Sequence, residues 1–218
     1  MAELASAAGL VLLASGGMDS TTLAYELDST GVVFTPLFID YGQHCRATEE
    51  ATLLSVLPGA ARERLAIVRV LDVYAGSRSR LIKPADLWNT QISADDLYLP
   101  YRSLLLLSVG AAYAQAHGCM ELHAAFINSN HAHEIDCTAE FFDKLSMVLS
   151  GYGGVQVVLP YRNLTKVEVL QRGIELGAPV ERTYSCQASA SVPCGACPNC
   201  VDRLDAIARL NEVASVDK

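Results

Sequence analysis

The sequence has few charged residues, and acidic side chains outnumber basic ones. Charged residues make up 18% of the 218 residues, below the usual share of about 25%, whereas hydrophobic residues make up 51%. This composition excludes disorder over most of the chain. There are 24 acidic and 16 basic side chains, which gives a net charge of −8. A chain of this sign gains little from counterion release on DNA or RNA, so we expect no nucleic-acid partner.

Long apolar runs and early basic residues are missing as well. The first Lys or Arg is Arg46, so the N-terminal segment lacks the basic start of a secretory signal. The apolar stretch 104–116 contains Ser108, Gly110 and Gln115 and is too short to span a bilayer, which predicts a buried helix. We therefore expect a cytoplasmic protein with no membrane partner. In that compartment, clustered cysteines indicate metal or redox chemistry more than disulfides.

Apolar segments of strand length alternate with helix-like segments along the chain. We expect strands at residues 10–14, 32–39, 65–71, 121–127 and 155–159. We expect helices at residues 19–27, 46–57, 100–117, 138–149, 165–176 and 200–212. This alternation predicts an α/β fold with a doubly wound parallel sheet. The segment 76–99 lacks clean periodicity and is predicted to be a long loop, of the kind that often forms a lid or a substrate wall.

A glycine-rich turn follows the first predicted strand. It reads Ser15-Gly16-Gly17-Met18-Asp19-Ser20-Thr21. Adjacent glycines let the backbone approach an anion, the N–H groups of the following helix face that anion, and the hydroxyls add donors. The turn lacks the lysine of a Walker loop and the third glycine of a dinucleotide fingerprint. A turn that only caps a helix is the structural alternative, but strand, glycines, hydroxyls and acid together favour phosphate binding.

The turn resembles the Ser-Gly-Gly-x-Asp-Ser signature of the ATP pyrophosphatase, or PP-loop, superfamily. In that superfamily the loop binds the pyrophosphate that leaves when ATP adenylates a substrate oxygen, which stabilises the transition state. The resemblance implies ATP and Mg²⁺ as cofactors, bound through residues 15–21. It implies that Asp19 orients the loop or helps to hold Mg²⁺. The substrate stays open, because one fold serves many substrates.

Four cysteines cluster near the C-terminal end, at Cys186, Cys194, Cys197 and Cys200. Zn²⁺ prefers tetrahedral thiolate sites, and two two-residue spacers let a turn present successive sulfurs to one ion. Four ligands close the site, so such a zinc would be structural and would contribute folding energy. An iron–sulfur cluster and unligated thiols are the alternatives; zinc is favoured because nothing else in the sequence indicates electron transfer.

Further motifs resemble the QueC family of 7-cyano-7-deazaguanine synthases, in the family's order and over nearly the whole chain. They are Asp40-Tyr41-Gly42-Gln43, Leu99-Pro100-Tyr101-Arg102, Asp136-Cys137, Leu164-Thr165-Lys166, Glu175-Leu176-Gly177-Ala178-Pro179 and Thr183-Tyr184-Ser185-Cys186. The resemblance implies that the carboxylate of 7-carboxy-7-deazaguanine is adenylated and that ammonia attacks to give an amide. A second ATP then activates the amide oxygen, and its expulsion leaves a nitrile.

The same resemblance implies site residues, domains and an assembly. Tyr41 and Gln43 would bind the nucleotide, while Lys166 and Arg102 would supply positive charge to phosphate or carboxylate; for both cations a surface role is the alternative. We expect an ATP-binding α/β domain over residues 1–183. A zinc segment with a final helix would occupy residues 184–218 and pack on the same domain. Family members are often homodimers, so we expect one here.

Some positions depart from the family pattern. Ser103 stands in place of the usual Asn, His44 follows Gln43 directly, and the first cysteine spacer has seven residues where eight is typical. The stretch 128–136, which faces the deazapurine in the family, is rewritten and contains His131 and His133. These two are candidates for an auxiliary metal pair, although solvated loop histidines are commoner. The pattern indicates a divergent member.

Other functions stay open at this stage. The enzyme could stop at the amide, or could join the deazapurine to a protein or peptide amine, because QueC-like proteins also occur in bacterial antiphage operons. A PP-loop tRNA sulfur transferase would use Cys45 and Cys137, but the acidic charge and the lack of a basic extension disfavour it. A non-catalytic nucleotide-binding subunit is disfavoured by the intact loop hydroxyls and Asp19.

Overall fold

The computed structural model describes residues 9–84, 92–127, 137–189 and 192–216, and the strands found there form one parallel sheet. The strands are β1 (Leu10–Leu13), β2 (Phe34–Asp40), β3 (Ala66–Arg69), β4 (Glu121–His123) and β5 (Gln156–Val158). Their order across the sheet is β3-β2-β1-β4-β5. Because the order reverses between β1 and β4, the chain winds outward in both directions, which confirms the predicted doubly wound α/β fold.

The central strand β1 is apolar throughout because both of its faces are covered. It pairs in parallel with β2 on one side and with β4 on the other, so Leu12 lies opposite both Pro36 and His123. Val11 and Leu12 point to opposite faces and are both fully buried. A strand in this position gains from burying every side chain, which explains why its sequence shows no polar alternation.

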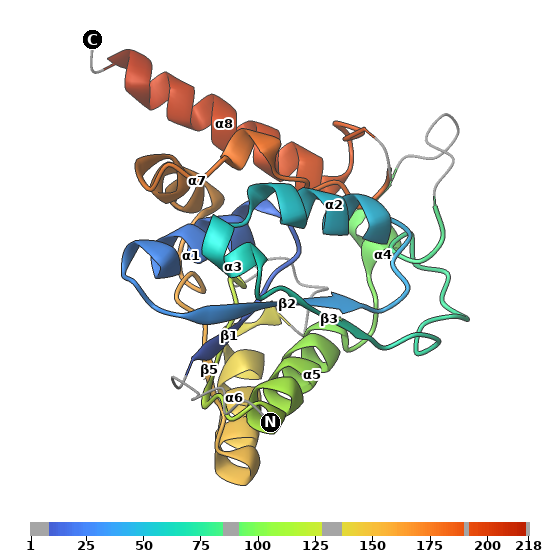
Figure 1. Cartoon of the computed structure of the whole chain (residues 1–218). Helices are drawn as coiled ribbons and strands as arrows, with labels where there is room; N and C mark the ends of the chain where they lie inside the picture. The colour runs from blue at the N-terminus through green and yellow to red at the C-terminus, as the bar shows by residue number, and fades with distance from the viewer. Residues whose placement is uncertain (1–8, 85–91, 128–136, 190–191, 217–218) are drawn as a thin grey trace.

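Helices lie on both faces of the sheet (Figure 1). One face carries α1 (Met18–Ser29), α2 (Arg46–Val56), α3 (Gly59–Arg62), α7 (Lys166–Glu175) and α8 (Pro198–Val216); the other carries α5 (Arg102–Ala116) and α6 (Ala139–Gly153). Each layer has its own core: Leu23, Phe34 and Val169 pack on the first face, and Leu107 and Phe142 pack on the second.

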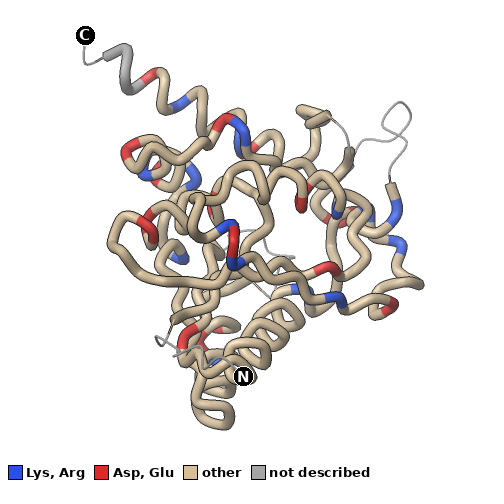
Figure 2. The backbone as a smooth tube through the Cα atoms, in the orientation of Figure 1, with Lys and Arg blue, Asp and Glu red and all other residues tan. Residues whose placement is uncertain are grey.

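Helix α5 lies close against the sheet and is nearly free of charge. Arg102 is the only charged residue in it, so the tube of Figure 2 is almost entirely tan along this helix. A Cβ added at Gly110 would stand 2.9 Å from the Leu122 methyl groups, so the small residue permits the close approach. The buried helix predicted over 104–116 is confirmed. Among the described residues, no helix is long and apolar enough to cross a membrane.

Several element boundaries differ from the sequence expectations. Helix α5 begins at Arg102, not Pro100, because Tyr101 adopts a left-handed conformation with φ of 57°. Helix α8 begins at Pro198, two residues before the expected start, because proline suits the first turn of a helix. The expected loop 76–99 contains one helical turn, α4 (Ala94–Leu97), which Ser93 caps. A short 3-10 helix, η2 (Val180–Arg182), follows α7.

The C-terminal helix packs on the α/β layer through a small apolar cluster. Ala206, Ile207 and Leu210 of α8 contact a group that contains Met18 of α1 and Leu170 of α7. Helix α8 therefore rests on the two helices whose first residues border the carboxyl ends of the strands. The division into residues 1–183 and 184–218 stays a prediction.

Candidate active site

A cavity of about 280 Å³ lies at the carboxyl ends of β1, β2 and β4, where the strand order reverses. This is the position at which open α/β sheets bind their ligands. The cavity brings together most of the residues that the sequence singled out: Ser15, Gly17, Met18, Asp19, Ser20, Tyr41, Gln43, Arg102 and Lys166. These residues come from four separate parts of the chain, so the fold assembles the site.

The phosphate loop, residues 15–21, is held by short-range hydrogen bonds. The Ser15 N–H donates to Ser20 Oγ at 3.3 Å, and the Ser20 hydroxyl donates to the Gly17 carbonyl at 3.3 Å. Helix α1 begins at Met18, and its N-cap Gly17 has no side chain to bond the first N–H groups. Those N–H groups and the positive end of the helix are available to an anionic ligand.

Two predicted loop residues support the loop and are not among the residues that line the cavity. Gly16 has φ of +75°, and a Cβ there would stand 2.8 Å from the Leu53 nitrogen and 2.9 Å from the Glu49 carbonyl oxygen of α2. Only glycine fits both the dihedral angle and the close approach. Thr21 is fully buried in α1, and its hydroxyl oxygen has no hydrogen-bond partner among the residues that the structure describes. Direct ligand contact by either residue stays a prediction.

An ion pair joins the start of α1 to the start of α7. Lys166 Nζ lies 2.7 Å from both carboxylate oxygens of Asp19, and each side chain is about a quarter exposed (26%). Lys166 is placed by the capping box of α7, in which Thr165 and Glu168 exchange hydrogen bonds. Two of the three residues predicted to be catalytic, Asp19 and Lys166, are therefore in contact, beside the N–H groups of the phosphate loop, while the third, Arg102, lines the same cavity.

A second polar group lies at the end of β2. Gln43 Oε1 accepts the Tyr41 N–H at 2.9 Å, while its Nε2 donates to the Ile39 carbonyl at 3.2 Å and to Glu49 Oε2 at 3.0 Å. Burial raises the pKa of Tyr41 to about 12, against the opposing influence of Arg102. Burial also raises the pKa of Glu49, against a hydrogen bond from Gln43 and the charge of Arg102.

Glu49 is a cavity residue that the sequence did not reveal. It lies on α2 next to Glu50, and the two are alike in the printed sequence. In the structure Glu49 lines the cavity, whereas Glu50 pairs with Arg46 at 2.7 Å. Nothing in the sequence states which of two adjacent acids faces inward, because that depends on the rotation of the helix on the sheet.

The C-terminal wall, residues 183–189, closes another side of the cavity. Tyr184, Ser185 and Gln187 line it, and the Tyr184 N–H donates to the Gly16 carbonyl at 3.0 Å. This wall has no regular secondary structure. The Thr-Tyr-Ser-Cys motif connected the segment with the QueC family. Its position against the phosphate loop could be seen only in the three-dimensional structure.

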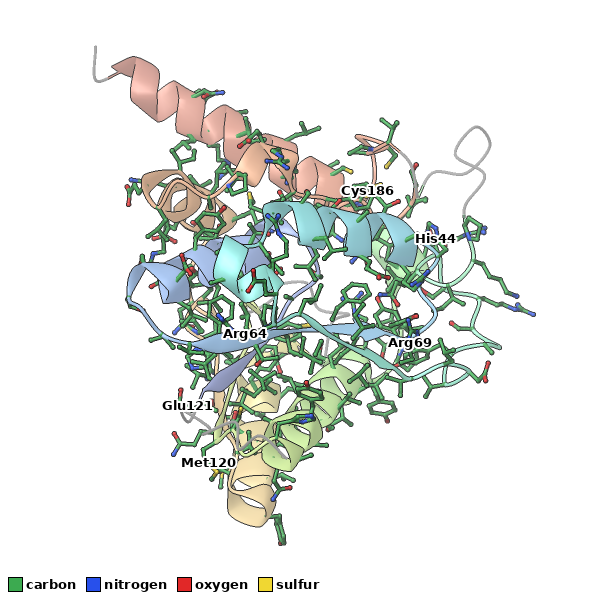
Figure 3. All side chains as sticks on the ribbon, viewed as in Figure 1. His44, Arg64, Arg69, Met120, Glu121 and Cys186 are labelled. Atoms are coloured by element: carbon green, nitrogen blue, oxygen red, sulfur yellow. The ribbon has the colours of Figure 1, made fainter. Side chains whose placement is uncertain are left out.

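Side chains from distant segments hold the C-terminal wall. Arg203 of α8 donates to the Thr183 hydroxyl and to the Val180 carbonyl. The Cys45 thiol donates to the Ser189 carbonyl at 3.2 Å, and His44 Nε2 lies 3.0 Å from the Gln187 carbonyl oxygen. Figure 3 shows His44 and Cys186 at the same end of the molecule, opposite Met120 and Glu121.

The four predicted metal ligands come together beside this wall. The sulfur atoms of Cys186, Cys194, Cys197 and Cys200 all lie within 4.8 Å of one another. A tetrahedral site with Zn–S bonds of about 2.3 Å needs sulfur separations of roughly 3.8 Å, so a small contraction completes it. Cys186 belongs to the wall, and Cys197 and Cys200 flank the first residues of α8. A metal here would join the wall to the helix.

Hydrogen bonds favour a thiolate in the cysteine cluster before any metal binds. The Cys197 thiol and backbone N–H groups that include those of Cys194 and Ser189 donate to Cys186, which lowers the pKa of Cys186 to about 4. The same contact, together with burial, raises the pKa of Cys197. A cluster of thiols with one stabilised thiolate is a donor set that suits Zn²⁺.

Other sequence expectations lie elsewhere. His131, His133 and Asp136 fall in 128–136, outside the described residues. In the segment 76–99, Leu81, Leu97 and Leu99 pack in a core with Tyr184 and Cys186 and do not line the cavity. The described part of that segment therefore supports the C-terminal wall, and it does not itself form the substrate wall that the sequence suggested.

Comparison with known families gives a match over most of the chain. The family model described as "Queuosine biosynthesis protein QueC" matches residues 9–211. The chain belongs to the QueC family. A 7-cyano-7-deazaguanine synthase of Caldicellulosiruptor bescii is 32% identical, over 92% of this chain and 92% of that protein. The synthase of Archaeoglobus fulgidus is 30% identical, over 90% of this QueC-family chain and 84% of its own length.

Solved structures of more distant proteins share the fold. A 4-thiouridine synthetase, solved with RNA and bound ATP, aligns over 94% of the QueC-family chain and 53% of its own, with a TM-score of 0.53 and 16% identity. The U34-tRNA thiolase NcsA of Methanococcus maripaludis, solved with a 4Fe-4S cluster, aligns over 96% of this chain and 68% of its own, with a TM-score of 0.54 and 14% identity. At such identities the likeness shows the fold alone.

Proposed function

We propose that this chain is an ATP-dependent ligase that converts 7-carboxy-7-deazaguanine through an amide to 7-cyano-7-deazaguanine. The observation that carries the proposal is the Asp19–Lys166 pair at the phosphate loop of a QueC-family cavity. The named relatives, which match along nearly their whole length, support the same reaction. The acidic charge and these relatives leave the tRNA sulfur transferase without support.

The phosphate end of the cavity suits the first half of this reaction. The N–H groups at the start of α1 bind the phosphates of ATP, and Lys166 adds positive charge where pyrophosphate departs. Asp19 orients Lys166 through two hydrogen bonds. The carboxylate oxygens of Asp19 also suit an Mg²⁺ that arrives with ATP. These oxygens would then contact both the ion and the Lys166 ammonium group.

The other end of the cavity suits the carboxylate that is activated. Arg102 is the cation at that end, where its charge acts on Tyr41 and Glu49. Because the pKa of Tyr41 is about 12, its phenol stays protonated at neutral pH and can donate a hydrogen bond. Leu37, Phe38 and Phe126 add apolar surface, which limits hydrolysis of a reactive adenylate.

The cysteine cluster has a structural part in the proposal. With four thiolate ligands, Zn²⁺ would have no open position for a substrate, so it would fix the C-terminal wall to α8. We also propose that the protein is cytoplasmic and that it forms a homodimer. Light scattering on the purified chain tests the dimer directly.

The test measures products and pyrophosphate together. Purified protein with ATP, Mg²⁺, ammonium and 7-carboxy-7-deazaguanine should form the nitrile, seen by mass spectrometry, and should release pyrophosphate only when the carboxylate is present. Accumulation of the amide, or of an adduct with a protein amine, would contradict the proposed product. A role in antiphage defence would need such an adduct.

A variant pair connects this chemistry to the site. Lys166→Met should slow pyrophosphate release on the order of 10²-fold, because one preorganised positive group is lost from the departing phosphates. Lys144→Met is the matched control. Lys144 pairs with Glu140 on the exposed side of α6, with both side chains about three quarters exposed (74% and 77%), and its loss should change nothing.

A further inference from the structure

Glu49 places a carboxyl group in a cavity that otherwise suits anions. It lines the same space as the phosphate loop, Lys166 and Arg102. The proposed reactants, ATP and a carboxylate, are both negatively charged, so a further, half-buried carboxylate opposes their binding. A carboxylate in such a position lowers the affinity for these anions. Its presence is explained if it accepts a hydrogen bond or a proton from a reactant.

The surroundings of Glu49 hold its carboxyl in one position. Gln43 donates to Glu49 Oε2 and is itself fixed by the Tyr41 N–H and the Ile39 carbonyl. Arg102 of α5 is the cation whose charge acts on Glu49. Among the described residues, the hydrogen bond of the Glu49 carboxyl is therefore with Gln43, and not with the Asp19–Lys166 pair at the phosphates.

The other titratable groups near Glu49 are already engaged. The Asp40 carboxylate accepts the Gly42 N–H and lies 3.8 Å from Nε of both Arg46 and Arg69. Tyr41 and Cys45 both have pKa values raised to about 12 by burial, so each stays protonated at neutral pH. Among the described residues of this group, Glu49 is the carboxylic acid that lines the cavity, where it can exchange a proton with a bound reactant.

We propose that Glu49 accepts the proton that ammonia loses when it attacks the acyl adenylate. The inference rests on the proposed function, because that reaction supplies the adenylate and the ammonia. Arg102 and Tyr41, the groups proposed to bind the carboxylate, are the neighbours of Glu49, so the carboxyl lies next to the reacting carbon. Gln43 donates to Glu49 Oε2, so within the described part of the chain Glu49 Oε1 is the oxygen that can face the incoming nitrogen.

The proposed step balances in atoms and charge. The nitrogen lone pair of ammonia forms a bond to the acyl carbon, and the bond from that carbon to the AMP oxygen breaks. AMP leaves with the electron pair, and one N–H proton passes to the Glu49 carboxylate. The products are the amide, AMP and a protonated Glu49, which returns its proton to water. Formation of the nitrile later removes the two remaining N–H protons, which the same group can accept in turn.

Burial makes Glu49 better suited to this task. The raised pKa of Glu49 strengthens the carboxylate as a base, because the ideal general base titrates near the operating pH. The rate of amide formation should rise as pH increases through that pKa, since only the ionised carboxylate accepts a proton. The hydrogen bond from Gln43 and the charge of Arg102 act in the opposite direction and favour the ionised carboxylate.

The test separates adenylation from the attack of nitrogen. Glu49→Gln keeps the shape of the side chain and removes the base. Exchange of radiolabelled pyrophosphate into ATP, dependent on 7-carboxy-7-deazaguanine, should stay within about threefold of the unmodified protein. Amide formation from ammonium should fall on the order of 10²-fold and lose the limb of its pH profile that Glu49 sets.

Hydroxylamine provides a second nucleophile that depends less on a general base. It is largely neutral at pH 7 and more reactive than ammonia, so its capture of the adenylate as a hydroxamate should survive in Glu49→Gln within about threefold. Retained exchange and capture would also show that the variant is folded. Glu50→Gln is the matched control, because Glu50 pairs with Arg46 and is not among the cavity residues; it should react with ammonium normally.

Three outcomes would overturn the inference while leaving the proposed function standing. Loss of pyrophosphate exchange in Glu49→Gln would assign Glu49 to adenylation or to Mg²⁺. A raised KM for the deazapurine, with equal loss for both nucleophiles, would assign it to recognition of the deazaguanine edge. An unchanged rate with ammonium would leave it without a chemical role. By contrast, absence of exchange in the unmodified protein would overturn the proposed function itself.

Discussion

Two walls of the cavity are built in opposite ways. The phosphate loop is held by hydrogen bonds between residues a few positions apart, such as Ser15 to Ser20. The C-terminal wall is held by side chains from remote segments, such as Arg203 and Cys45, and by the cysteine cluster. Among the described residues, the hydrogen bond from the Tyr184 N–H to the Gly16 carbonyl joins the two walls.

This difference between local and long-range support shows which wall of the cavity depends on the rest of the molecule. Local hydrogen bonds form whenever the loop and α1 form, so beyond its own sequence the phosphate loop needs mainly the close packing of Gly16 against α2. The C-terminal wall has irregular backbone, and it keeps its shape only while its distant partners stay in place. We therefore expect changes far from the cavity to reach the nucleotide through this wall.

Removal of the proposed zinc should have the largest effect on this difference between the two walls. Chelation, or Cys186→Ser, should cost on the order of 3 kcal/mol of stability, and at about 2–4 °C per kcal/mol the Tm should fall by about 10 °C. Because the wall also bonds the phosphate loop, affinity for ATP should fall about tenfold. Calorimetry of unfolding and of ATP binding, with metal analysis, measures all three.

A thiol outside the cluster provides the control for that experiment. Cys119 is buried beside α5 and belongs to the core of the opposite sheet face. Cys119→Ala should leave the metal content and ATP affinity unchanged. If ATP binds equally well to the metal-free protein, the two walls are independent and the comparison drawn here is wrong.

Substitution of Gly16 tests the local wall and should have the next largest effect. Gly16→Ala places a methyl group 2.8 Å from the Leu53 nitrogen at a positive φ. Gly31→Ala is the control, because Gly31 has nearly the same φ of +74° but nothing within 4 Å of the added carbon. Both variants pay about 1 kcal/mol of strain, and only Gly16→Ala should also lose ATP affinity, by about tenfold.

Equal ATP affinity in the two glycine variants would show that close packing against α2 does not shape the phosphate loop. Isothermal titration with a non-hydrolysable ATP analogue gives the affinities, and urea unfolding gives the stabilities.

Arg203→Gln should have the smallest of these effects. Its guanidinium holds the Thr183 hydroxyl and the Val180 carbonyl, and loss of such bonds costs about 1–3 kcal/mol. The KM for ATP should rise roughly threefold with kcat nearly unchanged, because Arg203 acts on the wall and does not touch the reacting atoms. Arg209→Gln is the control, since within the described residues Arg209 pairs with the exposed Asp205 of the same helix. Identical kinetics in both variants would remove Arg203 from the support of the wall.

The sequence predicts the parts of the site that depend on neighbouring residues. The phosphate loop and the four cysteines are visible because their spacing alone determines how their donors can converge. Family resemblance indicated Asp19 and Lys166 separately, but their pairing was not predicted, because the two residues come from separate helices. The parallel sheet was predictable because β1 is apolar on both faces.

The remaining parts depend on rotation and packing that no local pattern encodes. Glu49 and Glu50 differ only in the direction each takes from α2. The strand expected at 121–127 ends at His123, and Ala124 to Phe126 go on to line the cavity, a change of role that apolar composition does not reveal. Helix α5 begins at Arg102, because the preceding Tyr101 has a left-handed backbone conformation. A tyrosine side chain does not predict that conformation.

The hydrogen bond between Tyr184 and Gly16 also has a consequence for the order in which parts of the chain fold. It joins the first turn of the sheet to a segment near the other end of the sequence, so it is among the contacts with the longest chain separation. We expect such a contact to form late in folding, because the loop between its two residues must first be closed. The phosphate loop can take shape early, yet the cavity has its full set of walls only after the last helix has docked. A partly folded chain would thus present an open nucleotide site, and completion of the C-terminal segment would turn that site into an enclosed one.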